Sequence, residues 1–137
     1  MVCDDLERDA RDRVTGEYAG AVLVVTGALT AGLGFGVIVP GTLLRILLGA
    51  DHPDATSRFI ARYCFLLGAL VGCLLIAAAA QPALRVAAMS VAAVEKLGFA
   101  ALVLASPLRY RALTMTFVAI DTVMVLLYAL LFFGIIS

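Results

Sequence analysis

The sequence predicts an all-α integral membrane protein, built as a bundle of four transmembrane helices in an up-down-up-down arrangement. Its composition is the first reason. Hydrophobic residues make up 64% of the 137 residues and charged residues 15%, whereas a soluble domain has about 45–50% apolar and about 25% charged residues. The second reason is that the apolar residues gather in four stretches, each close to the roughly 20 residues that a helix needs to cross a bilayer core.

The first predicted helix covers residues 18–39, carries no charge and ends at Pro40–Gly41, a pair that interrupts helices. Glycine recurs along this helix at every seventh position, at Gly20, Gly27, Gly34 and Gly41. Small residues allow two helix backbones to approach closely. We therefore expect this glycine face to pack against another helix, either inside the bundle or across a homodimer.

Residues 1–17, "MVCDDLERDARDRVTGE", mix acidic and basic groups. They lack the apolar core and the cleavage site of a signal peptide. We expect a charged cytosolic tail, either solvated and frayed or folded as a short surface helix. Arginines are shared almost evenly between the two ends of the bundle, so the positive-inside rule gives no clear orientation. The charged tail favours two cytoplasmic termini and a place in the cell (inner) membrane.

The other three predicted helices cover residues 58–80, 83–105 and 112–136. Thr56 or Ser57 is the expected N-cap of the first of them. Gln81–Pro82 and Ser106–Pro107 separate the three helices. Connections this short make consecutive helices antiparallel neighbours.

Residues 41–57 form the longest connection. Its "TLLRILLGA" segment is expected to lie in the membrane interface as a short amphipathic helix, and "DHPD" then makes a turn. Asp51, His52 and Asp54 are potential metal ligands in that turn. Polar residues at a loop tip are usually turn formers, and the sequence places no fourth ligand. We therefore expect no metal.

Composition also argues against several other classes of function. The formal net charge is zero, so no basic field points to nucleic acid as a partner. Cys64 and Cys73 would lie about 13.5 Å apart on one helix, which is too far for a disulfide. No Cys-x-x-Cys or Cys/His cluster is present to hold zinc or an iron–sulfur centre, or to perform thiol redox chemistry. We expect no cofactor.

The segment "SVAAVEKLGFAALVLA", residues 90–105, places two ionisable groups, Glu95 and Lys96, in the middle of an apolar helix. Sequence neighbours on a helix do not face each other well, so each needs another partner. Lys96 lies nine residues before Ala105, and Asp121 lies nine residues after Ala112. In an antiparallel hairpin both groups are therefore about 13.5 Å from the turn. The Lys96 side chain is too short to extend from this depth to the membrane interface, so we expect Lys96 to meet Asp121.

Other polar residues extend this constellation into an expected cavity, with Glu95, Lys96 and Asp121 as its floor. Thr114 and Tyr128 lie seven residues on either side of Asp121. Near its start, the second predicted helix adds Arg58, Arg62 and Tyr63. The candidate catalytic residues are Glu95, Asp121 and Lys96, and the candidate substrate-binding residues are Arg62, Tyr63, Tyr128, Thr114 and Arg58. Arg58, Arg62, Arg109 and Tyr110 are expected to line the mouth.

A purely structural interpretation remains open. Lys96–Asp121 and Glu95–Arg62 would then be buried ion pairs that fix the helix register. Buried pairs add little net stability, because desolvation offsets their attraction. A charge at mid-membrane costs at least about 2.5–3.5 kcal/mol, so three such groups are hard to explain by packing alone. For Thr114, Tyr128 and Tyr63 taken singly, a packing role is favoured.

The constellation favours a membrane enzyme acting on a lipophilic small molecule. A carboxylic acid in an apolar pocket retains its proton and can donate it to a substrate, while a second, ionised carboxylate takes a proton or positions water. Lys96 would keep Asp121 ionised, which makes Glu95 the expected acid. Epoxide opening by hydrolysis or cyclisation and double-bond isomerisation fit this set without a metal. No Ser/His or Cys/His arrangement points to covalent acyl transfer.

The segments "RFIARYCFLLGALVG" and "VEKLGFAALVLA", followed by a mid-helix aspartate, resemble small four-helix integral membrane proteins of bacteria and fungi, some associated with natural-product pathways. Acidic residues within a helix bundle also resemble those of integral membrane terpenoid cyclases, which have more helices. The resemblance implies epoxide or cyclisation chemistry.

Two other classes of function stay open. A proton-coupled small-molecule transporter is one, because small multidrug exporters have similar length and four helices. Their membrane glutamate lies in the first helix, whereas this chain has no acid there beyond Glu17. A non-catalytic accessory subunit is the other, with the glycine face of the first helix as its docking surface.

Overall fold

The computed structural model describes residues 2–49 and 52–133, with side chains from residue 16 onward. Within these residues the chain is helical, with no strand. Four helical segments are long and apolar enough to cross a membrane, judged by length and composition: Gly16–Ile38, Ala55–Ala80, Pro82–Leu104 and Ala112–Phe132. The all-α class and the four apolar helices expected from the sequence are confirmed.

Helix α1 (Val2–Ala31) is continuous and contains the charged segment that precedes Tyr18. The boundary expected near residue 18 is thus a change of composition within one helix. η1 (Gly32–Gly34) and α2 (Phe35–Ile38) follow, and the backbone leaves the helical region at Val39, with φ −122° and ψ 55°. Pro40 causes this break, because its ring disfavours the helical conformation in the residue before it.

The next segment consists of α3 (Pro40–Leu43) and η2 (Leu44–Leu48), a π-helical turn. The short helix expected from "TLLRILLGA" is therefore present up to Leu48. It ends at Gly49, which has a positive φ of 69°, a conformation that glycine adopts without strain. Ala50 and Asp51 lie outside the described residues.

Helix α4 (Ala55–Ala80) begins earlier than expected, because its N-cap is Asp54 and not Thr56 or Ser57. The Asp54 carboxylate accepts a hydrogen bond of 2.8 Å from the Ser57 backbone N–H, which satisfies one of the free donors of the first turn. Ser57 takes part in the cap as the donor. The helix ends at Gln81–Pro82, as expected.

η3 (Pro82–Leu84) leads into α5 (Arg85–Leu104), and η4 (Pro107–Tyr110) leads into α6 (Ala112–Phe132). Ser106 begins the turn between α5 and α6, and its hydroxyl accepts a hydrogen bond of 3.2 Å from the Leu108 N–H. The expected end of the last helix at residue 136 lies outside the described residues.

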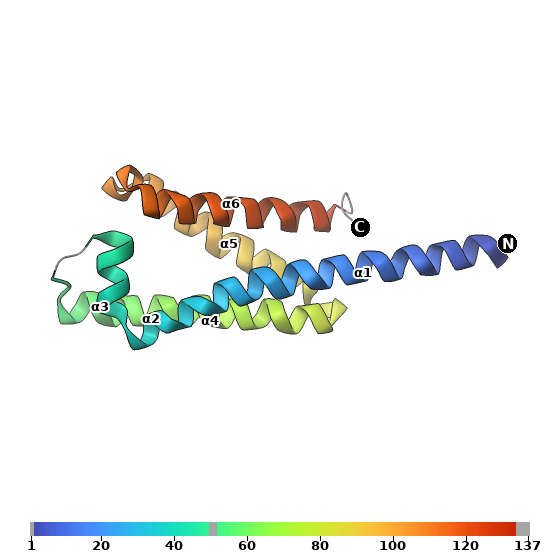
Figure 1. Cartoon of the computed structure of the whole chain (residues 1–137), viewed down its shortest axis with the longest axis horizontal. Helices are drawn as coiled ribbons and strands as arrows, with labels where there is room; N and C mark the ends of the chain where they lie inside the picture. The colour runs from blue at the N-terminus through green and yellow to red at the C-terminus, as the bar shows by residue number, and fades with distance from the viewer. Residues whose placement is uncertain (1, 50–51, 134–137) are drawn as a thin grey trace.

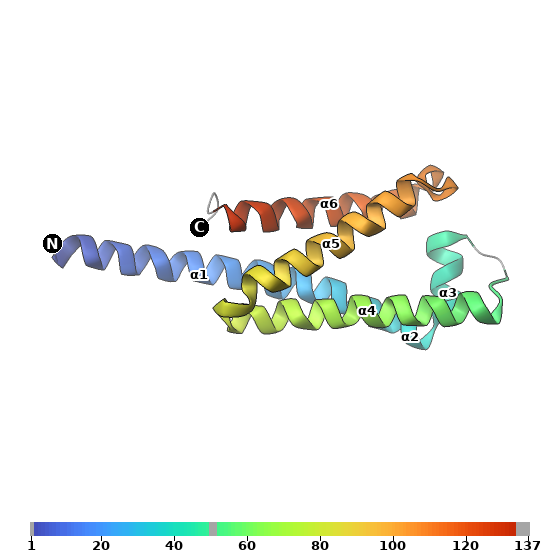
Figure 2. The ribbon, with the colours of Figure 1, turned by 180° about the vertical axis from the view of Figure 1, so that it is seen from behind.

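The helices form two pairs (Figures 1 and 2). α4 lies alongside α1, α6 lies alongside α5, and α5 crosses from the end of α4 toward the start of α6. The pairs are close near the Gln81–Pro82 connection and diverge toward the end that carries α3. All four long helices contribute to the core at the closed end: Leu23, Leu75, Ala78, Ala88, Met89, Ala92, Met124 and Tyr128.

The glycine face of α1 packs inside the chain, against α4. A Cβ atom added at Gly27 would lie 2.8 Å from the Gly72 carbonyl oxygen. A Cβ atom added at Gly72 would lie 2.6 Å from the Gly27 carbonyl oxygen and would also meet the backbone of Ala31. The two backbones therefore touch directly, which is the packing expected of small residues in membrane helices.

Two further contacts give the register of this pair. Gly20 faces the backbone of Ala79, and Gly36 faces the ring of Phe65. Residue numbers rise along α1 and α2 while they fall along α4, so the two helices are antiparallel. The intramolecular alternative for the glycine face is the one that this chain adopts, and a homodimer through the same face stays a prediction.

Candidate functional site

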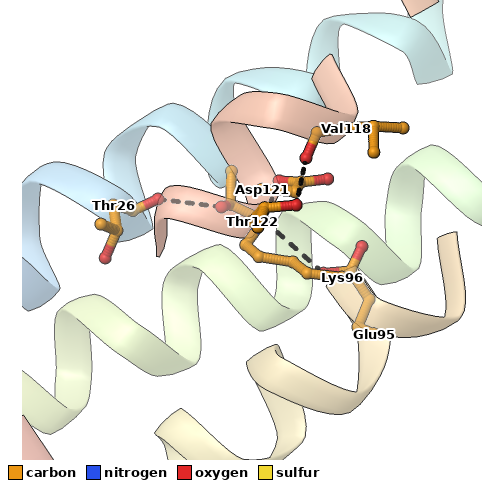
Figure 3. A network of polar contacts seen from close by, with 7 residues as sticks. Thr26, Glu95, Lys96, Val118, Asp121 and Thr122 are labelled. Carbon is orange, nitrogen blue, oxygen red and sulfur yellow. Dashed lines mark hydrogen bonds and ion pairs between the residues drawn. The ribbon is translucent and has the colours of Figure 1, made fainter. Parts of the chain in front are cut away.

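Lys96 and Asp121 meet between α5 and α6 (Figure 3). The Lys96 Nζ lies 2.8 Å from Asp121 Oδ1 and donates a hydrogen bond to it. Lys96 is 3% exposed and Asp121 is 19% exposed. Both positions follow from helical spacing, because Lys96 comes one turn after the buried Ala92 and Asp121 comes one turn before the buried Met124. The contact expected from their matched depth is present.

Glu95 lies beside this pair and has no hydrogen-bonded partner among the described side chains. Its Oε2 atom is 3.8 Å from Lys96 Nζ, and the side chain as a whole is 34% exposed. Oε2 itself is buried and accepts no hydrogen bond in the part of the chain that the structure describes. The Lys96 ammonium group therefore has two carboxyl groups near it, and it is hydrogen-bonded to the closer one, that of Asp121.

The Glu95–Arg62 ion pair that belongs to the alternative, purely structural interpretation is not formed, because these two side chains do not come within salt-bridge distance. Arg62 is exposed near the start of α4. At that end of the molecule, the α5–α6 pair has diverged from α4 (Figure 2). The crossing of α5 over α4 separates the segments that carry these two residues (Figure 2).

Two threonines of α1 are buried polar residues that the sequence interpretation missed. The Thr26 hydroxyl donates to the Val22 carbonyl at 2.8 Å, and the Thr30 hydroxyl donates to the Thr26 carbonyl at 2.9 Å. Figure 3 shows Thr26 on the helix that faces the Lys96–Asp121 contact. Their spacing was the available signal, because Leu23, Thr26, Gly27 and Thr30 form one i, i+3, i+4, i+7 face and are all buried.

The polar stripe expected on α6 faces inward, but its three members have different surroundings. Thr114 is buried and donates a hydrogen bond of 2.6 Å to the Leu47 carbonyl, which ties α6 to η2. Tyr128 belongs to the apolar core, and its buried hydroxyl has no hydrogen-bond partner among the described residues. Seven residues separate each of them from Asp121, or about 10.5 Å along the helix. Thr114 therefore has a packing role of its own.

The remaining candidates lie elsewhere. Arg58, Arg62 and Tyr63 are exposed at the start of α4, and the two arginines line a pocket of about 380 Å³ formed with the residues around Pro40. Glu95, Lys96 and Asp121 do not line this pocket. Arg109 donates to the Tyr110 hydroxyl at 2.8 Å on the exposed surface of η4. The arginine pocket and the buried carboxylates are therefore two separate places, and Arg58 and Arg62 do not open onto the carboxylates through this pocket.

The loop residues considered as metal ligands also have other positions. His52 lines the arginine pocket and Asp54 caps α4. Asp51 lies outside the described residues. Among the residues that are described, no group of three His, Cys, Asp or Glu side chains is placed to hold a metal ion.

No protein-family model, no curated protein and no solved structure matches this chain.

Proposed function

We propose that the chain is a small integral membrane enzyme that uses Glu95 and Asp121 as a general acid and a general base on a lipophilic small molecule. The best candidate reaction is epoxide opening, by hydrolysis or cyclisation, with double-bond isomerisation as a related possibility. The observation that carries the proposal is the buried, unpartnered Glu95 Oε2 beside a closed Lys96–Asp121 pair. In this proposal the four spans cross the cell (inner) membrane up-down-up-down, with both termini in the cytoplasm.

The charge balance assigns the two roles. A single Lys96 ammonium group can compensate one carboxylate, and its 2.8 Å contact is with Asp121. Glu95 Oε2, at 3.8 Å, receives no hydrogen bond that would stabilise a negative charge. A second ionised carboxyl group in an apolar bundle is costly, so Glu95 carries the proton and Asp121 carries the charge. Two carboxyl groups in different environments divide acid and base work in this way.

Epoxide opening uses both groups in one step. Glu95 donates its proton to the epoxide oxygen as a carbon–oxygen bond of the ring breaks, and the bond's electron pair stays on that oxygen as a hydroxyl group. Asp121 accepts a proton from the water, or from the substrate hydroxyl, whose oxygen forms the new bond to carbon. After this step Glu95 has lost a proton and Asp121 has gained one, and proton exchange with water restores both residues. Lys96 keeps Asp121 ionised before the step and positions it.

Tyr128 is the remaining polar group on the face of α6 that carries Asp121. Its buried hydroxyl, without a partner in the described part of the chain, can orient a substrate oxygen. The substrate-binding roles expected for Arg58, Arg62, Tyr63 and Thr114 stay predictions, because these side chains lie away from the two carboxyl groups or bond the backbone.

The test is turnover of lipophilic epoxides by detergent-solubilised protein, followed by mass spectrometry of the diol or cyclised product. A panel of long-chain fatty epoxides and terpenoid epoxides supplies the substrates. Glu95→Gln and Asp121→Asn preserve size and hydrogen bonding but remove the acid and the base. Each should lower the rate by about 10²–10⁴-fold. Glu17→Gln, the same exchange at an exposed residue of α1, is the matched control and should keep the wild-type rate.

Other outcomes point to other functions. Wild-type rates in both amide variants would contradict the catalytic assignment. Proton-coupled uptake of a substrate by proteoliposomes, with no conversion of any epoxide, would favour the transporter. An absence of both activities in the wild-type chain, together with co-purification of a second membrane enzyme, would favour the accessory subunit.

A further inference from the structure

The arginine pocket has a composition that the acid–base chemistry does not use. Its lining combines three arginines and a histidine with an apolar rim: Arg45, Arg58, Arg62, His52, Ile38 and Val39. No Asp or Glu among the described residues lines this pocket. Its volume of about 380 Å³ is within the range of small-ligand sites. Because three arginines line the pocket and no described carboxylate does, the pocket favours an anionic ligand.

The fold brings these arginines together from two segments. Arg58 and Arg62 are one turn apart on α4, so their side chains leave the helix on the same face. Arg45 comes from η2 and lines the same pocket. The Arg58 Nε donates a hydrogen bond of 3.0 Å to the Pro53 carbonyl, which fixes the plane of its guanidinium group at the pocket. The neighbouring Asp54 carboxylate is engaged by the Ser57 N–H.

The length of α4 places the pocket at the depth of lipid headgroups. Its 26 residues span about 39 Å, whereas the hydrocarbon core of a bilayer is about 30 Å thick. The uncharged part of the helix follows Arg62, so the excess length falls at the Ala55 end. The first two turns, with Arg58 and Arg62, therefore lie at the headgroup level.

The rim of the pocket is apolar and faces outward. Ile38 on α2 lines the pocket and is 73% exposed, and Phe59 on α4, which lines a neighbouring pocket, is 71% exposed. A second pocket of about 270 Å³ is lined by Ala55, Arg58, Phe59 and Arg62, so it shares both arginines of α4. A ligand with a charged head and an apolar tail would place the head among the arginines and the tail along Ile38 or Phe59. A free inorganic anion would leave this rim unused.

We propose that the pocket lined by Arg45, Arg58 and Arg62 binds a phosphate anion, and that an anionic phospholipid headgroup supplies it. Arginines form charge-assisted hydrogen bonds with phosphate oxygens, often two at a time, and clustered basic side chains at the membrane surface attract anionic lipid headgroups. This site is separate from Glu95, Lys96 and Asp121. Lipid binding here does not depend on the proposed acid–base step, because neither Glu95 nor Asp121 lines the pocket.

The experiment measures thermal unfolding of the full-length protein in dodecyl maltoside with increasing dihexanoyl phosphatidylglycerol. A ligand that binds only the folded protein raises the Tm with its concentration, and the affinity follows from that dependence. Arg45→Gln and Arg62→Gln should weaken the affinity about 10- to 100-fold, the loss typical of one hydrogen bond to a charged group. Arg109→Gln, an exposed arginine of η4 outside the pocket, should keep the wild-type response.

Two further ligands identify the source of the phosphate. Dihexanoyl phosphatidylcholine has the same tails and a zwitterionic headgroup, and inorganic phosphate has no tail. A Tm rise specific to phosphatidylglycerol and lost in Arg62→Gln would support the proposal. An equal rise with inorganic phosphate would assign a free-anion site and overturn the lipid assignment. An equal rise with phosphatidylcholine, or an unchanged response in both pocket variants, would overturn the proposal itself.

Discussion

The α1–α4 contact and the α5–α6 contact join helices by opposite means. Along α1 and α4, glycine backbones touch at Gly27 and Gly72. Between α5 and α6, a buried lysine reaches across to an aspartate at 2.8 Å. The first contact depends on shape alone, and the second depends on a charge that must be neutralised inside the bundle.

We expect the α1–α4 contact to serve packing and the α5–α6 contact to serve chemistry. Backbone contacts between small residues give close packing and van der Waals attraction, but they hold no group that can donate or accept a proton. A buried ion pair adds little net stability against an apolar replacement, so its retention favours a use beyond packing. The α1–α4 pair is therefore expected to tolerate few changes of size, and the α5–α6 pair few changes of charge.

The largest expected effect comes from breaking the charged contact on one side. Lys96→Met leaves Asp121 buried without its cation, which should lower the free energy of unfolding by about 3–5 kcal/mol. The double variant Lys96→Met with Asp121→Leu should recover most of this loss, since an apolar pair can replace a buried ion pair. Denaturant unfolding in detergent measures both. Equal stability of the single variant and the wild type would show that the pair is solvated.

The glycine contact should be less sensitive to a single change, but it should respond to a methyl group. Gly72→Ala places a Cβ atom against the backbones of Gly27 and Ala31, and overpacking of this kind typically costs about 1–3 kcal/mol. Gly98→Ala is the matched control, because a Cβ atom at Gly98 would meet nothing within 4 Å. Thermal unfolding of the two variants compares them directly. If both behaved alike, the close approach of α1 and α4 would not exist in solution.

A smaller effect is expected at the bond that links α6 to η2. Thr114→Val keeps the shape of the side chain but removes the hydroxyl that donates to the Leu47 carbonyl. The loss should be about 1 kcal/mol. Thr116→Val is the control, because the exposed Thr116 hydroxyl bonds the Ala112 carbonyl of its own helix. The free energies of unfolding in detergent should differ between the two variants. Equal values would contradict the hydrogen bond between Thr114 and Leu47.

The smallest expected effect depends on pH and lies at the start of α4, outside the membrane-spanning segments. Hydrogen bonds from the Ser57 side chain and backbone N–H lower the pKa of the Asp54 carboxyl from its ordinary value. The cap therefore contributes stability above the unfolded pKa of about 3.9, and this contribution is lost as pH falls through the lower folded pKa.

Asp54→Asn tests this effect, because asparagine caps helices but does not titrate in this range. The wild type should melt above Asp54→Asn near pH 6, and the gap should close toward pH 3. Asp54→Ala removes the cap and should melt below both near pH 6. A gap between the wild type and Asp54→Asn that did not change with pH would contradict the cap.

Periodicity and breakers along the chain were enough to predict the spans and one contact of the site. Apolar length located four helices, Pro40 and Pro82 ended two of them, and counting residues from one turn brought Lys96 to Asp121. Those features depend on neighbours in sequence or on a single short hairpin. Such counting cannot predict the position of Arg62 relative to Glu95, because that position depends on the crossing of α5 over α4 and not on depth.

Two other misses have local causes. Asp54 was not recognised as the cap, because the helix was expected to begin at residue 58 with Thr56 or Ser57 as its N-cap. Thr26 and Thr30 were not recognised because their hydroxyls bond their own helix and carry no charge. Only their place on one face with Gly27 indicated burial. The arginine pocket combines η2 with the start of α4, two segments whose approach no short-range pattern specifies.

The separation of Lys96 and Asp121 along the chain has a consequence for biogenesis. The two residues lie 25 positions apart, so α5 leaves the ribosome with Lys96 before α6 exists to neutralise its charge. Alone in lipid, that charge would cost at least about 2.5–3.5 kcal/mol. The threonines of α1 need no such partner, because they bond their own helix. We therefore expect α1 to enter the bilayer as a single segment, while α5 waits in the translocon and partitions together with α6 as a preassembled hairpin.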